Sequence, residues 1–203
     1  MTKIYVVKKG RKTGKFNTWK ECQQQVIGFK GAIYKSFTSE EEADEYWNSN
    51  IGEEFDPSKL PDTYAFTDGS FNNRTKTYGY GGFLVHKRKK YILQGSGKEE
   101  DMVSMRNASG EILGARAAVE KAISLNIKEL TIVYDHFGVE MWATGRWKRL
   151  KTGTIAYHEY MQSVKDKIKL KFLKVEGHTG VPGNEEADRL AKKAVGIIKE
   201  NED

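Results

Sequence analysis

Apolar and polar positions divide the chain into two patterned blocks. In the first block, an alternating segment at residues 3–8 predicts a strand, and a basic turn leads into a second one. A helix is expected over residues 19–28, a strand over 32–37 and another helix through Trp47. Each helix is preceded by Ser or Thr with Glu three residues later, the spacing of a capping box. The block therefore predicts a small α/β domain.

A polar stretch with Gly52, Pro57 and Pro61 follows and predicts a linker. The second block alternates strands and helices, which predicts a mixed five-stranded sheet with helices on both faces. Its expected strands are a segment ending at Asp68 and residues 78–86, 89–97, 129–135 and 169–175; its expected helices are 107–125, one from Phe137, one near 155–168 and one from Asn184. The predicted organisation is a domain at 1–48, a linker at 49–62 and an α/β domain at 63–203.

Four acids stand at similar places in the second block. Asp68 and Asp135 each end an apolar strand, and Gly69-Ser70 after the first acid predicts a turn. Glu111 lies near the start of an apolar periodic helix, and Asp188 lies in a helix. Taken one at a time, these acids have structural explanations. Asp68 is typical of a turn, and Glu111 is typical of a helix start, where the helix dipole favours negative charge. For the last helix, Asn184 is the expected N-cap.

Gathered in one place, the four acids would have a chemical consequence. Like charges repel one another unless a cation neutralises them. Carboxylate oxygens suit hard divalent ions, and two such ions can clamp the attacking and leaving oxygens of a phosphodiester. The set therefore favours a two-metal phosphodiester chemistry.

The second block resembles type 1 ribonuclease H over residues 62–197. The resemblance rests on the four acids and on a Gly-flanked His loop ten residues before the last acid. The matching residues are Thr67-Asp68-Gly69-Ser70, Glu111, Asp135, Gly177-His178-Thr179-Gly180, Asn184 and Asp188. It implies the ribonuclease H fold and an endonuclease that hydrolyses the RNA strand of RNA–DNA hybrids, leaving 5′-phosphate and 3′-hydroxyl ends.

The resemblance also implies a role for each acid. Asp68 would bridge two Mg²⁺ ions, with Mn²⁺ as the alternative metal. Glu111 and Asp135 would bind the ion at the leaving 3′ oxygen, and Asp188 the ion that activates water. His178 would shuttle a proton near the leaving group or help release product, since the pKa of His lies near working pH.

Two further residues would contact substrate. Asn107, four residues before Glu111, matches a family Asn that contacts the substrate backbone. Ser70 would face the RNA 2′-hydroxyls, the group that distinguishes RNA from DNA at a given position.

The first block resembles the hybrid-binding domain found before many type 1 ribonucleases H. The matching residues are Tyr5 to Gly14, Thr18-Trp19 and Tyr34-Lys35-Ser36-Phe37. The resemblance implies that Trp19 and Tyr34 stack on the sugars of the DNA strand, that Lys35 holds a phosphate and that Tyr5 lies near the groove. The alternative is that Trp19 and Tyr34 are core residues. Residues 1–35 hold nine Lys and Arg against one Glu, a charge that suits a phosphate backbone.

The sequence departs from the families at several places. Residues 71–76 lack the Gly-Asn-Pro-Gly loop of many members, and His136 stands where Ser is common. Ser36 replaces a second Lys of the hybrid-binding domain. The stretch 147–151 resembles a shortened form of a basic handle that some members carry. The substrate contacts of residues 71–76 and the phosphate affinity at Ser36 are therefore open.

Two other functions fit parts of the pattern. One is a binding protein with an inactive nuclease domain, against which the complete set of acids argues. The other is a recombinase or integrase on the same fold, because fold alone does not decide function. No 18-residue apolar run or secretory signal is present, and Cys22 is the single cysteine. We therefore expect a soluble, cytoplasmic monomer that binds hybrid duplexes and no membrane.

Overall fold

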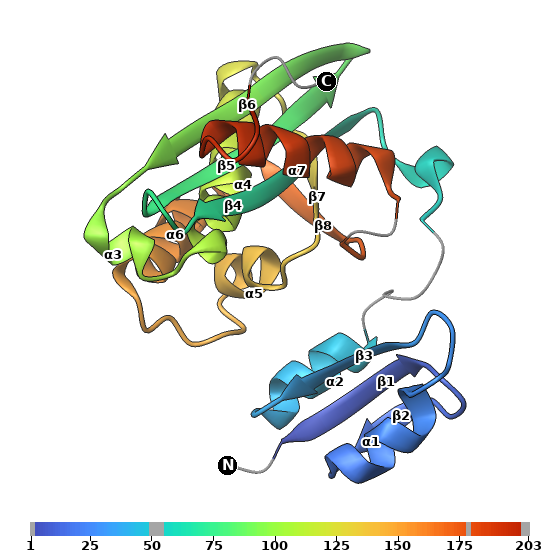
Figure 1. The fold of residues 1–203 in the computed structure, drawn as a ribbon. Coiled ribbons are helices and arrows are strands. Elements are labelled where there is room, and N and C mark those ends of the chain that lie inside the picture. The colour runs from blue at the N-terminus through green and yellow to red at the C-terminus, as the bar shows by residue number, and fades with distance from the viewer. Residues whose placement is uncertain (1–2, 49–54, 178–179, 200–203) are drawn as a thin grey trace. The chain divides into compact units, whose positions relative to one another are not determined.

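The computed structural model describes residues 3–48, 55–177 and 180–199 (Figure 1). It divides into two compact units, Met1–Phe55 and Asp56–Asp203, which are described separately. In the described part of the chain, no helix combines the length and the apolar character needed to cross a bilayer.

The first unit is a three-stranded antiparallel sheet with two helices. Its elements are β1 (Ile4–Lys9), β2 (Gly14–Phe16), α1 (Trp19–Val26), β3 (Ile33–Phe37) and α2 (Glu40–Asn48), and the strand order is β2-β1-β3. This is the element order expected from the sequence. The expected capping box starts α1, since the Glu21 amide donates to Thr18 Oγ1 at 3.2 Å and the Thr18 amide to Glu21 Oε2 at 3.1 Å. Val7, Cys22 and Val26 form the small core.

The second unit is a mixed five-stranded sheet in the order β6-β5-β4-β7-β8. The strands are β4 (Thr63–Asn72), β5 (Thr77–His86), β6 (Lys89–Gly97), β7 (Glu129–Tyr134) and β8 (Lys169–Lys174). The helices are η1 (Pro57–Lys59), α3 (Glu100–Val103), α4 (Asn107–Ser124), α5 (Gly138–Thr144), α6 (Thr152–Ser163) and α7 (Pro182–Ala194). Strands β4, β7 and β8 run parallel, and β5 and β6 pair antiparallel.

Helices cover both faces of this sheet, as the sequence predicts (Figure 1). On one face, α4 lies so close that a Cβ at Gly114 would be 3.2 Å from the Cβ atoms of Thr67 and Tyr80. On the other, α7 contacts the sheet so closely that a Cβ at Gly81 would lie 2.0 Å from the Ala191 amide nitrogen. The main core lies on the α4 face and includes Ala65, Leu84, Ile112, Leu130, Ile132 and Tyr134.

The predicted turn at Gly69-Ser70 is wrong. Strand β4 continues through both residues, which pair with Tyr80 and Gly79 of β5. A Cβ at Gly69 would lie 2.4 Å from both the Asn107 carbonyl oxygen and the Glu111 amide nitrogen. Gly69 is therefore needed for the close approach of the α4 N-terminus, and not for a turn.

Substituting Gly69 by Ala is expected to lower the melting temperature, because the new methyl group would meet backbone atoms that cannot rotate away. Overpacking of this kind costs about 1–3 kcal/mol of unfolding free energy, sometimes more. Gly114→Ala is the control on the same interface, since its contacts of 3.2 Å are milder and Ala favours helix by about 1 kcal/mol. Thermal unfolding of both variants measures the difference; equal melting temperatures would contradict the explanation.

The helices α7, α6 and α3 differ from prediction. Helix α7 begins at Pro182 after Val181, so Asn184 lies inside the first turn and is not the N-cap. Proline favours the first turn of a helix because it has no N–H to leave unpaired. Helix α6 spans Thr152–Ser163, earlier than expected, and α3 was not predicted. Asn184 is buried, and its side chain donates a hydrogen bond to Asp135 instead of capping the helix.

Candidate active site

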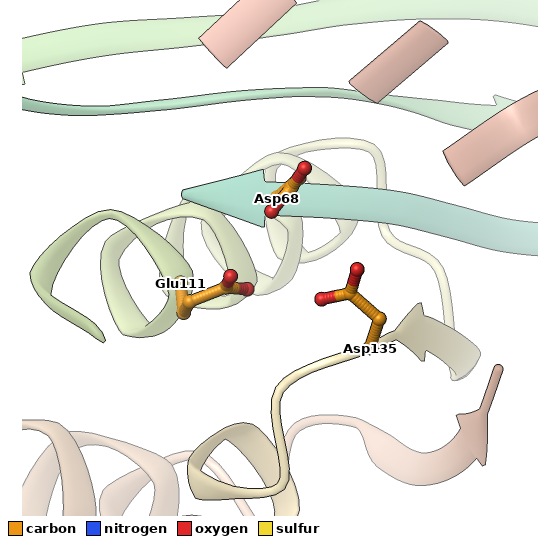
Figure 2. Close-up of side chains that lie close together, drawn as sticks. All are labelled: Asp68, Glu111 and Asp135. Atoms are coloured by element: carbon orange, nitrogen blue, oxygen red, sulfur yellow. The ribbon is translucent and has the colours of Figure 1, made fainter. Parts of the chain in front are cut away.

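Three of the four predicted acids converge where the end of β7 lies beside the middle of β4. Asp68 comes from β4, Glu111 from the first turns of α4, and Asp135 from the residue directly after β7 (Figure 2). Each contributes one carboxylate oxygen to a group in which all three oxygens lie within 4.8 Å of one another.

Strand register explains why these acids meet. Strands β4 and β7 are parallel neighbours, and Phe66 pairs with Val133. Two residues further along each chain stand Asp68 and Asp135, which therefore lie on the same face at the same level. Glu111 joins them because Gly69 lets the start of α4 reach the backbone of β4.

Burial makes these charges costly. Asp68 is 6% exposed and Glu111 is 4% exposed. Burial, and then the negative charge of Asp135, raises the pKa of Asp68 to about 7. Burial, and then the charges of Asp68 and Asp135, raises the pKa of Glu111 well above its ordinary value. Glu111 Oε2 is buried without a hydrogen-bond partner. The cluster is negatively charged, and one of its carboxylate oxygens has no hydrogen-bond partner. Such a group of oxygen ligands fits a hard divalent cation.

Two other segments close around Asp135. Asn184 Nδ2 donates to Asp135 Oδ2 at 3.1 Å, and a Cβ at Gly177 would lie 2.5 Å from the same oxygen. At Asp68, the Gly69 amide donates to Oδ1 at 2.7 Å. The hydrogen bond from Asn184 to Asp135 was missed, because an Asn at the start of a helix is equally typical of an N-cap.

The fourth acid lies next to this cluster but outside it. Lys192 Nζ donates to Asp188 Oδ2 at 2.6 Å within α7. The charge of Asp188 still contributes to raising the pKa of Asp68, although less than burial and Asp135 do. Asp188 therefore faces the same region, with Lys192 balancing its charge.

The remaining predicted residues of this unit are placed as follows. Asn107 is the exposed first residue of α4, one turn before Glu111. Ser70 is 6% exposed on β4. His178 lies outside the described residues, so its role stays a prediction.

In the first unit, Tyr5, Trp19 and Tyr34 form a surface cluster of aromatic rings. The ring centroids of Tyr5 and Trp19 are 5.7 Å apart, and those of Trp19 and Tyr34 are 5.9 Å apart. Trp19 is 41% exposed and Tyr34 is 42% exposed, so the alternative that both are core residues is wrong. Lys35 follows Tyr34 on β3 and is exposed, with Nζ 5.7 Å from the Phe37 ring centroid.

Comparisons with known proteins agree with both units. Residues 3–47 match the family model of the ribonuclease H1 N-terminal domain, and residues 61–196 match that of RNase H. Human ribonuclease H1 is 27% identical over an alignment that covers 98% of this chain and 91% of the human protein. A Saccharomyces cerevisiae ribonuclease H is 60% identical over 40 residues, 20% of this chain and 12% of that protein.

Solved structures share the fold of the second unit. RNase H1 from the archaeon Halobacterium salinarum gives a TM-score of 0.51 at 20% identity, covering 67% of this chain and 98% of that chain. The N-terminal RNase H domain of a Mycobacterium tuberculosis protein gives 0.53 at 19% identity, covering 66% and 95%. The family model at residues 61–196 spans more than half of the chain, and the chain therefore belongs to the ribonuclease H family.

Proposed function

We propose that this ribonuclease H hydrolyses the RNA strand of RNA–DNA hybrids with two Mg²⁺ ions and leaves 5′-phosphate and 3′-hydroxyl ends. The observation that carries the proposal is the group of three carboxylates from β4, α4 and the end of β7, with oxygens within 4.8 Å. The burial and the raised pKa values of Asp68 and Glu111 support a site built for cations.

Asp68, Glu111 and Asp135 would hold one ion, and Asp68 with Asp188 would hold the other. When bound, the two ions supply positive charge at the attacking and leaving oxygens of the phosphodiester. The protein's own contribution is orientation: the Gly69 amide fixes Asp68, and Asn184 fixes Asp135. Lys192 neutralises Asp188 in the structure described here and would give way on metal binding.

The bond changes follow from the proposed ends. A water oxygen joins the phosphorus and releases a proton to the solvent, and the bond from phosphorus to the 3′ oxygen breaks. The phosphate stays on the 5′ end of the downstream fragment, and the 3′ oxygen takes a proton and becomes a hydroxyl. His178 would supply or relay that proton, since a positioned His can act as a general acid near neutral pH.

Hybrid binding would be shared with the first unit. The ring cluster of Tyr5, Trp19 and Tyr34, of which Trp19 and Tyr34 are exposed, offers a stacking surface. The exposed Lys35, the next residue of β3, offers a charge for phosphate. The match of residues 3–47 to the ribonuclease H1 N-terminal domain supports this assignment. Asn107 and Ser70 would contact the substrate near the cleavage site.

Trp19→Ala is expected to weaken hybrid binding and to spare chemistry. Loss of one stacking aromatic costs about 1–3 kcal/mol of binding free energy, which is about 5- to 150-fold in affinity. Single-turnover cleavage measured against hybrid concentration separates the two effects. The control is Trp47→Ala, which removes a half-exposed ring of the same unit that contacts Lys8 instead. A collapse of the saturated rate at an unchanged half-saturation point would show that Trp19 acts in the fold or the chemistry.

One assay tests the function directly. The purified chain is incubated with a labelled RNA–DNA hybrid, an RNA duplex and a DNA duplex, with Mg²⁺ and with a chelator. We expect cleavage of the RNA strand of the hybrid only, with Mg²⁺ only, and fragments that accept a 5′ label only after phosphatase treatment. Binding without cleavage would favour an inactive nuclease domain, and cleavage of the DNA duplex would favour an integrase-like enzyme. The monomeric state and the cytoplasmic location stay predictions.

A further inference from the structure

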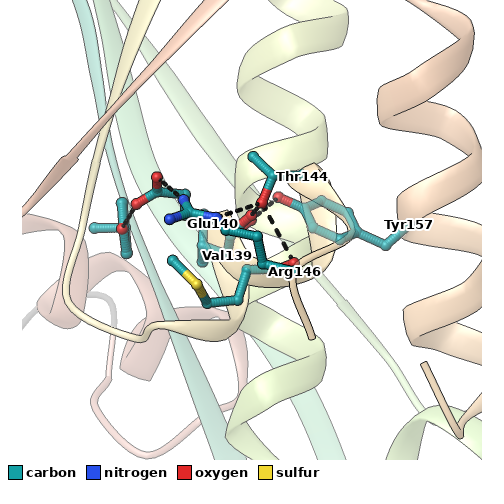
Figure 3. Close-up of polar contacts among 7 residues, drawn as sticks. Val139, Glu140, Thr144, Arg146 and Tyr157 are labelled. Atoms are coloured by element: carbon teal, nitrogen blue, oxygen red, sulfur yellow. Dashed lines mark hydrogen bonds and ion pairs between the residues drawn. The ribbon is translucent and has the colours of Figure 1, made fainter. Parts of the chain in front are cut away.

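A hydrogen-bond network runs from Tyr134, the residue before Asp135, to Glu140, Arg146 and Thr144 in and after α5 (Figure 3). Tyr134, the last residue of β7, is fully buried, and its hydroxyl donates to Glu140 Oε2 on α5. The other carboxylate oxygen of Glu140 pairs with Arg146. Arg146 Nε in turn donates to Thr144 Oγ1 at 3.1 Å. The Glu140 carboxylate therefore joins the end of the sheet to both ends of α5.

Helix α5 depends on such contacts. It has seven residues, Gly138–Thr144, and helices this short are not stable in isolation. A second buried tyrosine holds it from the other side, because the Tyr157 hydroxyl donates to the Val139 carbonyl oxygen at 2.9 Å. The first turn of α5 is thus fixed between β7 and α6.

The bond between Tyr134 and Glu140 also closes a small ring of chain that contains Asp135. At one end, the backbone of Tyr134 is fixed to β8, since the Val175 amide donates to its carbonyl oxygen at 2.9 Å. At the other end stands Glu140 on α5. Successive side chains of extended chain point to opposite faces, so Tyr134 enters the core while Asp135 turns to the carboxylate cluster.

We infer that Glu140, through the hydroxyl of Tyr134, is a positioning residue that holds Asp135 in place and so sets the affinity of the cluster for divalent ions. The inference rests on the proposed function, in which Asp135 is a metal ligand. Hydrogen-bond partners behind metal ligands commonly change metal affinity or activity by about 10- to 100-fold. Here the action passes through one residue of backbone, so the lower end of that range is expected.

Three variants of the full chain test the inference. Tyr134→Phe removes only the donor, Glu140→Ala removes the acceptor, and Glu140→Gln keeps an oxygen that can accept. The first readout is the Mg²⁺ concentration that gives half of the Mg²⁺-induced rise in melting temperature, without hybrid. The second readout is hybrid cleavage, from which the rate at saturating hybrid and the KM for the hybrid are measured separately. A change in Glu140 that were only structural would lower the melting temperature and leave both readouts unchanged.

We expect Tyr134→Phe and Glu140→Ala to raise the half-saturating Mg²⁺ concentration by about 10-fold. KM for the hybrid should stay unchanged, the double variant should be no worse than the worse single variant, and Glu140→Gln should restore most of the affinity. Glu120→Ala is the control, because it removes an ion pair with Arg116 on the surface of α4.

Wild-type Mg²⁺ dependence in both Tyr134→Phe and Glu140→Ala would overturn the inference. If Glu140→Ala fails to fold, Tyr134→Phe decides alone, since it deletes one oxygen atom. A wild-type chain that neither responds to Mg²⁺ nor cuts the hybrid would instead overturn the proposed function, so the two failures are distinguishable.

Discussion

Replacing Asp68 by Asn is expected to reduce the single-turnover rate of hybrid cleavage by about 1,000-fold or more while the chain stays folded. Asp68 is the central acid of the cluster, and the proposed mechanism uses it for both ions. Bound ions contribute several kcal/mol of transition-state stabilisation, and each 1.36 kcal/mol is a factor of ten in rate. Asn keeps the size of the side chain and an oxygen that can accept from the Gly69 amide. The charge is thus removed with little change in shape.

The measurement is cleavage at saturating hybrid and saturating Mg²⁺, with melting temperature as the check on folding. Asp166→Asn is the matched control, since Asp166 is an exposed acid of the same unit away from the cluster. A rate for Asp68→Asn close to that of the control would rule out the two-metal assignment.

Local sequence pointed to the acids because each one stands in or directly after a recognisable strand or helix pattern. Apolar runs that end in Asp68 and Asp135 are visible without any knowledge of the fold, and so is the helix that carries Glu111. What local sequence could not show is the reason for Gly69. Glycine is favoured both by turns and by close backbone approach. The close approach at Gly69 is to helix α4, which begins 38 residues later at Asn107.

The same ambiguity affected residues that act through tertiary contacts. An Asn near a helix start is typical of an N-cap, and only the fold shows that Asn184 donates to Asp135, 49 residues earlier. Tyr134 and Glu140 stand on different elements, so no helical or strand period pairs them. Their contact depends on how α5 turns back against the end of β7. The sequence likewise did not decide whether Trp19 is exposed or buried, because that depends on how the elements of the first unit pack.

The cluster also predicts an unusual dependence of stability on pH. In the metal-free protein, the contribution of Asp68 to the free energy of unfolding is expected to fall as pH rises from about 4 to about 7. The pKa of Asp68 is about 7 in the folded state, against an ordinary value of 3.8. Between these values the folded state binds more protons than the unfolded state, so stability decreases with rising pH. The raised pKa of Glu111 acts in the same direction.

Asp68→Asn isolates this effect, because Asn resembles the protonated carboxyl at every pH. At pH 8 in a chelator, we expect the variant to be more stable than the wild type by about 2–4 kcal/mol, since each pKa unit corresponds to about 1.4 kcal/mol. Near pH 4 the two proteins should have similar stability. Urea unfolding at both pH values measures the difference. Titrating groups away from the cluster cancel between the two proteins, and the loss of the Asp68 charge beside Glu111 acts in the same direction.

At pH 8, Mg²⁺ should make the wild type more stable than Asp68→Asn, the reverse of the order in chelator. Ions that bind the folded state stabilise it by mass action, and they do so by neutralising the charges that destabilise the metal-free cluster. The wild type should therefore gain stability from Mg²⁺ while Asp68→Asn gains little. The substitution that abolishes cleavage would then also be the one that stabilises the metal-free protein. Equal stability of the two metal-free proteins at pH 8 would show that Asp68 is not under the electrostatic strain that its burial and its neighbours indicate.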